Sequence, residues 1–494
     1  MRDVLCPQLA LGELPIGDII LDPKSRDDIP KLLAGLQHIY VTPDLREAVF
    51  AILREVIPQR AKGGTASAVL GRPGMVQWRI LVLGVVRLGL NADYDRVQEL
   101  ANQHQTLRQM LGHSDWENPQ RYEVQTLKDN LRLFTPEVLD RINQVVVRAG
   151  HRLVQPSLDA SLRGRCDSFV VETDVHFPTD ISLLYDAIRK ALQRGAELGA
   201  AGGVEGWRQH RHHLRQFKRQ YRAIQTLKHS TAQDEGKRAA RREQIQEAHR
   251  RYLDLAEGHL ERVERTLEAL AMGPAGALVE LKGYVVHAER QIDQIRRRVL
   301  NGEVIPHAEK VFSIFQPHTE WISKGKAGVP VELGLRVCVV EDQHRFILYS
   351  HVMEQQTDDQ VAIDMVTESR KRFPALRAMS LDKGFHSPAN RRGMEAELDL
   401  VAMPRKGRLS AADREREANP EFVRARRRHS AVESAINGLE HFGLDVCPDH
   451  GIAGFKRYVA LAVLARNLHR LGVAVRERNA RAKPDPQHSR SRAA

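Results

Sequence analysis

The periodicity of the apolar residues changes along this chain of 494 residues. It divides the sequence into the two parts of a sheet and a long helical stretch that separates them. β-Branched and apolar residues dominate 165–176, as in a strand, and strands return only from Val329. Between them lie a helix over Leu183–Arg194, a glycine-rich break, and a polar helical tract over about 207–298. The complete order is strand, long helical insertion, strand, strand, helix, strand, helix, strand, helix. This order predicts an α/β protein whose mixed sheet is interrupted after its first strand.

The elements after Val329 follow from alternation and turn signals. Two strands flank Glu341-Asp342-Gln343-His344, which indicates a hairpin. The predicted elements are strands Leu333–Val340 and Arg345–His351, a helix from about Asp358 to Phe373, strand Ala378–Leu381, helix Ser387–Leu398, strand Leu400–Pro404, and a helix carrying Glu433.

The region before the first strand is helical. Residues 1–41 contain Pro and Gly without clear periodicity and are expected to form a loosely structured arm. Three short helices follow, with apolar spacing in 42–86, a capped start at Tyr94, and an end at Gly112. They resemble a helix-turn-helix bundle, which could lay one helix in a DNA groove. An ordinary helical bundle gives the same pattern.

The charge balance favours a polyanionic partner. The formal net charge is +12 and the pI is about 9.6, which points to nucleic acid before membrane. A charge that only aids solubility is the alternative. The four cysteines lie far apart without metal-ligand spacing, which suggests a reducing compartment. No signal-peptide pattern and no apolar stretch of transmembrane length is apparent, so we expect a cytoplasmic protein without membrane contact.

Asp382 is the strongest candidate for a catalytic residue. It ends the apolar run Met379-Ser380-Leu381 and precedes Lys383-Gly384-Phe385, so its side chain should emerge at the carboxyl end of a sheet. An aspartate that only caps the helix beginning near Ser387 is the alternative.

The first strand carries three acids, and alternation separates them. Asp167 shares a face with Phe169 and Val171, whereas Glu172 and Asp174 lie on the other face. Asp167 and Asp174 therefore cannot both face one metal pair without a bulge. The pattern favours Asp167, and Asp174 stays open.

Glu433 has small and apolar neighbours in Val432-Glu433-Ser434-Ala435. A glutamate on the buried side of a helix is costly unless a cation or metal compensates it. An exposed glutamate paired with Arg426 or another arginine is the alternative. Strand, strand end and helix would then each supply one acid to a two-metal phosphoryl-transfer site holding Mg²⁺ or Mn²⁺.

Two basic stretches are suited to phosphate contacts. One precedes Glu433, and the other opens the polar helical tract at 208–219, where its density would follow a phosphate backbone. The candidate DNA-binding residues in them are Arg426, Arg427, Arg428, Arg211, Arg215 and Lys218. A solvated helix face explains most such charges equally well.

Two other enzyme classes have little support. The densest histidine cluster (His210, His212, His213) lies on an arginine-rich helix without a carboxylate partner, which disfavours a zinc hydrolase. No GxxxxGK[ST] loop is present, so ATP dependence is not expected.

The acidic blocks resemble those of DDE transposases of bacterial insertion sequences, of the ISNCY type. The resemblance extends from about Arg72 to Gly472. The matching blocks are Cys166-Asp167-Ser168-Phe169-Val170-Val171-Glu172-Thr173 with His176-Phe177-Pro178-Thr179-Asp180, Pro317-His318-Thr319-Glu320-Trp321-Ile322-Ser323-Lys324-Gly325-Lys326, Ser380-Leu381-Asp382-Lys383-Gly384-Phe385, and His429-Ser430-Ala431-Val432-Glu433.

The resemblance implies an RNase H-like catalytic domain in which Asp167, Asp382 and Glu433 bind divalent metal. It implies binding to the terminal inverted repeats of an insertion sequence, cleavage at its ends by a metal-activated water, and transfer of the 3′-hydroxyls into target DNA. Lys324 and Lys326 fall in the family's KGK block, where phosphate contact is expected. Because two DNA ends must meet, a homodimer or larger homo-oligomer is expected.

With that resemblance, the chain divides into six segments. They are an N-terminal arm (1–41), a helical DNA-binding domain (42–155), the first part of the catalytic domain (156–206), a helical insertion (207–300), the second part of the catalytic domain (301–475) and a basic disordered tail (476–494).

The chain also departs from related families around the glutamate. Where a Y-x2-R-x3-E-x6-K pattern is common, this chain has Arg426, His429 and Glu440, so only Glu433 is retained. The interval from Asp167 to Asp382 is long, at 382 − 167 = 215 positions, and the helical tract accounts for it as an insertion. A decayed transposase that binds DNA without catalysis is the competing interpretation, and metal-dependent cleavage distinguishes the two.

Overall fold

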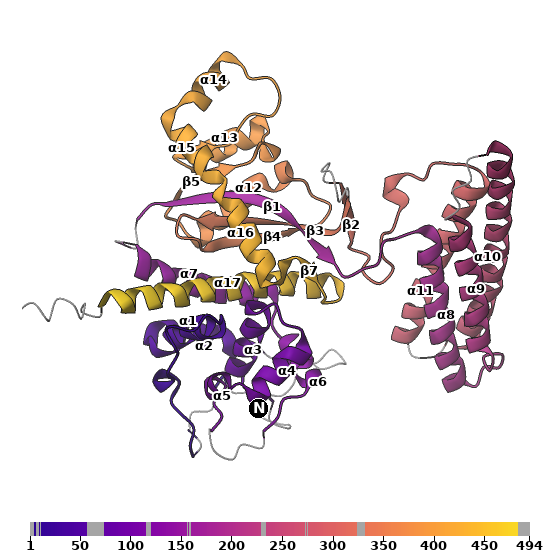
Figure 1. Ribbon diagram of the computed structural model, residues 1–494, viewed down its shortest axis with the longest axis horizontal. Coiled ribbons are helices and arrows are strands. Elements are labelled where there is room, and N and C mark those ends of the chain that lie inside the picture. Colours follow the sequence, from indigo (N-terminus) through magenta and orange to yellow (C-terminus); the bar gives the residue numbers. More distant parts are fainter. Residues whose placement is uncertain are drawn as a thin grey trace, which may run out of the picture. The chain divides into compact units, whose positions relative to one another are not determined.

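The structure, a computed structural model, describes residues 4–5, 9, 11–56, 74–114, 120–155, 157, 160–228, 234–271, 273, 275–323 and 331–482 (Figure 1). It is a mixed α/β protein, as the sequence predicts. The chain divides into two compact units, one made of Met1–Asp174 with Ile322–Ala494 and the other of Val175–Trp321. We call them the sheet unit and the helical unit.

The sheet contains strands that precede the helical unit in the sequence and strands that follow it. Its strands are β1 (Leu162–Thr173), β2 (Glu320–Ser323), β3 (Val331–Asp342), β4 (Ile347–Met353), β5 (Leu376–Leu381), β6 (Leu400–Ala402) and β7 (Val446–Cys447). The order is β2-β3-β1-β5-β6, with β4 beside β3 and β7 beside β1. β1 is antiparallel to β3 and parallel to β5, and β6 continues the parallel part. The prediction of a mixed sheet interrupted after its first strand is confirmed, as is the β3–β4 hairpin.

Two N-terminal helices of the sheet unit are introduced below. Besides them, the described part of this unit contains eleven α-helices and several short helical turns. Eight of them are α3 (Gln77–Gly89), α7 (Pro136–Val154), α12 (Asp358–Arg372), α13 (Pro388–Glu397), α14 (Ala411–Ala418), α15 (Pro420–His429), α16 (Ala431–Leu439) and α17 (Gly451–Ala482). The other three are α4 (Tyr94–Gln103), α5 (Gln105–Met110) and α6 (Val124–Leu131), and the short turns near the site are η4 (Lys383–Phe385) and η5 (Glu440–Leu444). The predicted helices and strands after Val329 therefore agree with the structure to within a few residues.

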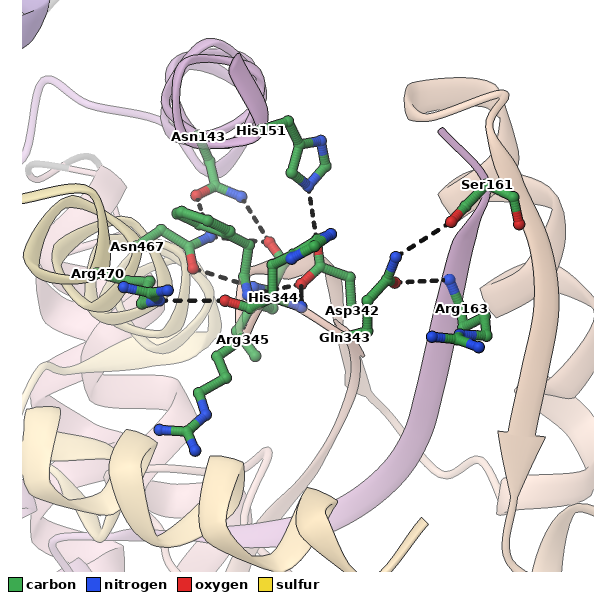
Figure 2. A network of polar contacts seen from close by, with 12 residues as sticks. Asn143, His151, Ser161, Arg163, Asp342, Gln343, His344, Arg345, Asn467 and Arg470 are labelled. Atoms are coloured by element: carbon green, nitrogen blue, oxygen red, sulfur yellow. Dashed lines mark hydrogen bonds and ion pairs between the residues drawn. The ribbon is translucent and has the colours of Figure 1, made fainter. Parts of the chain in front are cut away.

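The turn between β3 and β4 is held by side chains from α7 and α17 (Figure 2). Asp342 is fully buried, accepts a hydrogen bond from His151 at 2.6 Å, and accepts the backbone N–H of Phe346 at 2.9 Å. Asn467 accepts the backbone N–H of Ile347 at 2.9 Å. Because buried polar groups are costly unless they are bonded, these contacts fix the hairpin against both helices.

The expectation of a loosely structured arm over residues 1–41 is wrong for its second part. Helix α1 (Ile29–Val41) is followed directly by α2 (Pro43–Arg54), and α1 buries an apolar stripe that includes Leu32, Leu33 and Leu36. Pro30 lies in the first turn of α1, where a missing N–H removes no helical hydrogen bond.

Helix α1 crosses α17 at two glycines. A Cβ added at Gly472 would overlap the carbonyl oxygen of Lys31, and one added at Gly35 would overlap the carbonyl oxygen of Leu468. The two backbones are therefore in direct contact, and no larger residue fits at this crossing.

Helix α17 connects the N-terminal helices to the sheet. In Figure 1 it lies between β4 and the helices α1 and α3, and it packs on α7 along its length. One continuous apolar core includes residues from all of these elements. The division near residue 155 that the sequence suggests falls inside this core.

Helix α17 corrects the expectation that no apolar stretch reaches transmembrane length. Gly451–Arg481 is long and apolar enough by composition, with a mean hydropathy of 1.2 in its best window, but 72% of that window is buried inside the protein. Burial of this kind is that of a core helix. Residues 476–482, predicted to begin a disordered tail, continue α17, and 483–494 lie outside the described residues.

The helical unit contains four long helices around a core of its own. They are α8 (Asp180–Gly202), α9 (His210–Lys228), α10 (Glu235–Ala269) and α11 (Ala275–Ile295). The predicted insertion over 207–300 lies inside this unit, which also includes α8. The polar helical tract is not continuous, because α10 and α11 are separated near Gly273.

The predicted glycine-rich break after Arg194 is wrong at its start, because α8 continues to Gly202. Two glycines inside α8, Gly195 and Gly199, receive the indole ring of Trp207, which would overlap any Cβ at either position. Trp207 is 5% exposed and donates to Thr266 at 3.0 Å. These glycines allow close packing rather than ending the helix.

Candidate functional site

The pairing of β1 with β5 brings two predicted acids to neighbouring positions. In these parallel strands Cys166 of β1 pairs with Leu381 of β5. Asp167 is the residue after Cys166, and Asp382 is the residue after Leu381. Asp167 lies in the middle of β1, and Asp382 is the exposed residue that follows β5. Asp382 also caps the turn η4, accepting the backbone N–H of Lys383 at 2.6 Å. The helix that begins near Ser387, α13, is capped by Ser387 itself, so Asp382 does not have the capping role weighed as the alternative.

Asp167 is surrounded by other carboxylates. Burial, followed by the charges of Asp382, Asp358 and Glu433, raises the pKa of Asp167 to about 6, against the opposing hydrogen bond from the Ser168 backbone. The four acids come from β1, the end of β5, the start of α12 and α16. The structure thus brings together the three residues predicted from the sequence.

Asp358 is the residue that sequence reasoning missed. It lies in the first turn of α12, and its Oδ1 accepts a hydrogen bond from Ser168 Oγ at 2.6 Å. Acids are common in first turns because they complement the helix dipole, so its position in the sequence gave no distinctive signal.

Glu433 is exposed on α16, which corrects the expectation that it lies on the buried side. Helix α16 packs on β1, and its buried residues are Val432, Ala435 and Leu439. The alternative pairing with Arg426 is also not found, because Glu433 forms no ion pair within the described residues. Its charge acts on Asp167 instead.

Asp174 directly follows the last residue of β1. It is seven residues from Asp167, which is roughly 23 Å along an extended strand, and it is exposed beside Cys447 of β7. The sequence did not decide which of these two aspartates joins Asp382 and Glu433. In the structure, the charges of Asp382 and Glu433 act on Asp167.

His429 adjoins the acids from the end of α15. Its Nδ1 lies 3.2 Å from Ser380 Oγ, one strand position before Leu381. Burial lowers the pKa of His429, with Arg165 acting in the same direction and the charges of Asp382 and Glu433 opposing it. This shift favours the neutral imidazole, which offers a hydrogen bond rather than a charge.

The donor chemistry of the acids fits a hard divalent cation. Asp167, Asp382 and Glu433 offer carboxylate oxygens, which are the ligands that Mg²⁺ and Mn²⁺ prefer. Within the described residues, no group of three or more His, Cys, Asp or Glu side chains is drawn together closely enough to hold a metal ion. The acids are thus neighbours whose oxygens would have to converge further around a cation.

The predicted DNA-binding residues fall into three places. Arg426, Arg427 and Arg428 are exposed on α15 of the sheet unit. Arg211, Arg215 and Lys218 are exposed on α9 of the helical unit. Lys324 and Lys326 lie outside the described residues.

The pKa of Asp167 predicts a pH-dependent stability. A carboxyl group with a pKa of about 6 in the folded protein and 3.8 as its ordinary value binds its proton more tightly when folded. Asp167 therefore destabilises the fold increasingly as pH rises from about 4 to about 6, and fully above that. Asp167→Asn should raise the free energy of unfolding at pH 8, by on the order of 3 kcal/mol at most, and leave it unchanged near pH 4. Calorimetry with a chelator present measures this, and a difference independent of pH would contradict it.

The chain was also compared with protein-family models, with curated proteins and with solved structures, and none of them matches it.

Proposed function

We propose that this protein is a DDE transposase that cleaves DNA at the ends of an insertion sequence and joins them to target DNA. One observation carries the proposal: Asp167 and Asp382 follow paired residues of neighbouring parallel strands, and the charge of Glu433 reaches Asp167. Strand, strand end and helix each supply one acid, which is the arrangement that the resemblance implies. The interrupted mixed sheet supports an RNase H-like catalytic domain.

In this proposal Asp167, Asp382 and Glu433 hold Mg²⁺ or Mn²⁺. Bound there, the cations would lower the pKa of a water or 3′-hydroxyl nucleophile and neutralise charge on the phosphate. The chain itself contributes position: β1 and β5 fix the two aspartates on a packed sheet, and α16 sets Glu433 against β1. His429, hydrogen-bonded to Ser380, places an imidazole ring beside them.

The DNA partner is double-stranded, at both the element ends and the target. The net charge of +12 and the exposed arginines of α15 support contact with phosphates. The helices α4 and α5 are the helix-turn-helix candidate, with His104 both ending the first and capping the second. A homodimer or larger assembly in the cytoplasm completes the proposal.

The test is incubation of the purified protein with DNA carrying its own element's ends and Mg²⁺ or Mn²⁺. The expected result is cleavage at the element ends that requires the cation, read on both strands at nucleotide resolution. Salt-sensitive binding without cleavage under either cation would contradict the proposal and favour a non-catalytic DNA-binding protein.

A further inference from the structure

A concave site of the sheet unit lies near the acids. It is a pocket of about 460 Å³ between the starts of β1 and β5, the β3–β4 turn and α15. Four arginines line it, together with a single carboxylate: Arg163, Arg165, Arg424, Arg428 and Glu421. Glu421 and Arg424 lie 3.8 Å apart at the rim, so the pocket keeps an excess of positive charge.

The pocket and the acids lie along the same strand. Arg163, Arg165 and Asp167 alternate along β1 and so share one face of the sheet. Arg165 and Asp167 are two positions apart on the strand, which is roughly 7 Å. On β5, Ser380 lines the pocket and lies two positions before Asp382. A chain of phosphates bound at the acids would therefore continue into the pocket.

The rim of the pocket is held in place independently of any ligand. Gln343 of the β3–β4 turn donates to the carbonyl of Ser161 at 3.1 Å and accepts the backbone N–H of Arg163 at 2.8 Å (Figure 2). These two bonds fix the start of β1 while leaving the guanidinium group of Arg163 uncommitted. Within the described residues, that guanidinium and the one of Arg428 form no hydrogen bond or ion pair.

Arg165 forms the inner wall. Its Nη2 donates to Glu341 Oε2 at 2.6 Å and to the carbonyl of Asp342 at 2.9 Å, which fixes its orientation. Its Nε is buried and has no partner among the described residues. The guanidinium group of Arg165 is therefore held in one orientation at the pocket by Glu341 and the backbone of Asp342.

We infer that this pocket binds a phosphate of the same DNA strand whose neighbouring phosphodiester lies at Asp167, Asp382 and Glu433. This inference rests on the proposed function and adds a subsite to it. Arginine suits the role because its planar, permanently charged group bonds two phosphate oxygens at once. The pocket would fix the register of the strand, so that one phosphodiester is presented to the acids.

The test uses Arg163→Gln with Arg428→Gln in the full-length chain, since both side chains are exposed and neither takes part in the buried pair at Glu341. The matched control is Arg377→Gln with Arg392→Gln, which removes the same charge from exposed positions outside the pocket. Affinity for element-end DNA is measured without divalent cation at several salt concentrations, and with single phosphates replaced by neutral methylphosphonates.

For the wild type, a methylphosphonate at one position beside the cleaved bond should weaken binding about tenfold, and the pocket variant should be insensitive to it. The slope of log affinity against log salt should fall by about one in the pocket variant and stay unchanged in the control. If the wild type and the pocket variant were equally sensitive to every methylphosphonate, and the wild type still cleaved DNA, the subsite would be overturned and the proposed function would stand. Absence of cleavage by the wild type would instead contradict the proposed function. In that case, modification of Arg163 and Arg428 by phenylglyoxal would be measured with and without inorganic phosphate. Protection by phosphate would support the pocket as an anion-binding site, and absence of protection would overturn it.

Discussion

Asp382→Ala is expected to abolish cleavage of element-end DNA while leaving binding largely intact. Asp382 lies beside Asp167 on the neighbouring strand, and its loss removes one of three charges proposed to hold the cations. Charge stabilisation by such cations is worth several kcal/mol, so a loss of at least about a thousandfold in cleavage rate is expected. Glu433→Gln should have a similar effect, since the amide keeps the shape of the side chain but not its charge. The rate is measured in single-turnover assays with Mg²⁺.

The matched control is Asp174→Asn, which changes an exposed aspartate that directly follows the same strand. It should cleave at the wild-type rate. Wild-type nicking by Asp382→Ala or Glu433→Gln would contradict the assignment, and loss of cleavage in Asp174→Asn would return the first metal ligand to that residue.

Gly472→Ala is expected to destabilise the sheet unit by about 3 kcal/mol or more. The added methyl group would overlap the carbonyl oxygen of Lys31, and because that atom belongs to the backbone of α1, the two helices must separate. Since α17 also packs on α7 and β4, the separation would weaken the attachment of the N-terminal helices to the sheet. Urea unfolding followed by hydrogen exchange in α1 and α17 measures the effect.

Gly454→Ala in the same helix is the control. A Cβ there would come no closer than 3.5 Å to its neighbours, so the substitution should be neutral or stabilise α17 by up to about 1 kcal/mol. Equal stability of the two variants would show that the crossing of α1 and α17 is looser than the structure describes.

The sequence predicted the sheet and its acids because the period of the apolar residues changes where the strands begin. Alternation also separated Asp167 from Asp174 by face, and the charges of Asp382 and Glu433 act on Asp167 in the structure. It could not predict Asp358, because an acid in a first turn is ordinary and only the fold brings it to Ser168.

Other features depend on contacts between distant segments. The glycines of α8 suggest a break in isolation, yet they pack against Trp207, whose indole N–H donates to Thr266 of α10. Helix α1 has apolar spacing that the neighbouring Pro and Gly obscured, and its burial is provided by α17, more than 400 positions later in the sequence. The pocket near the acids is another such feature, because α15 and the β3–β4 turn form it together with the start of β1.

The central claim is that acids from separate segments form one cation site, and iron-mediated cleavage of the protein backbone tests it most directly. Fe²⁺ replaces Mg²⁺ at carboxylate sites, and with ascorbate and peroxide it generates hydroxyl radicals that cut the nearest peptide bonds. The account predicts cuts close to Asp167, Asp358, Asp382 and Glu433 together, suppressed by excess Mg²⁺ and absent in Asp382→Ala. Cuts confined to one of these segments, or unchanged in Asp382→Ala, would contradict it.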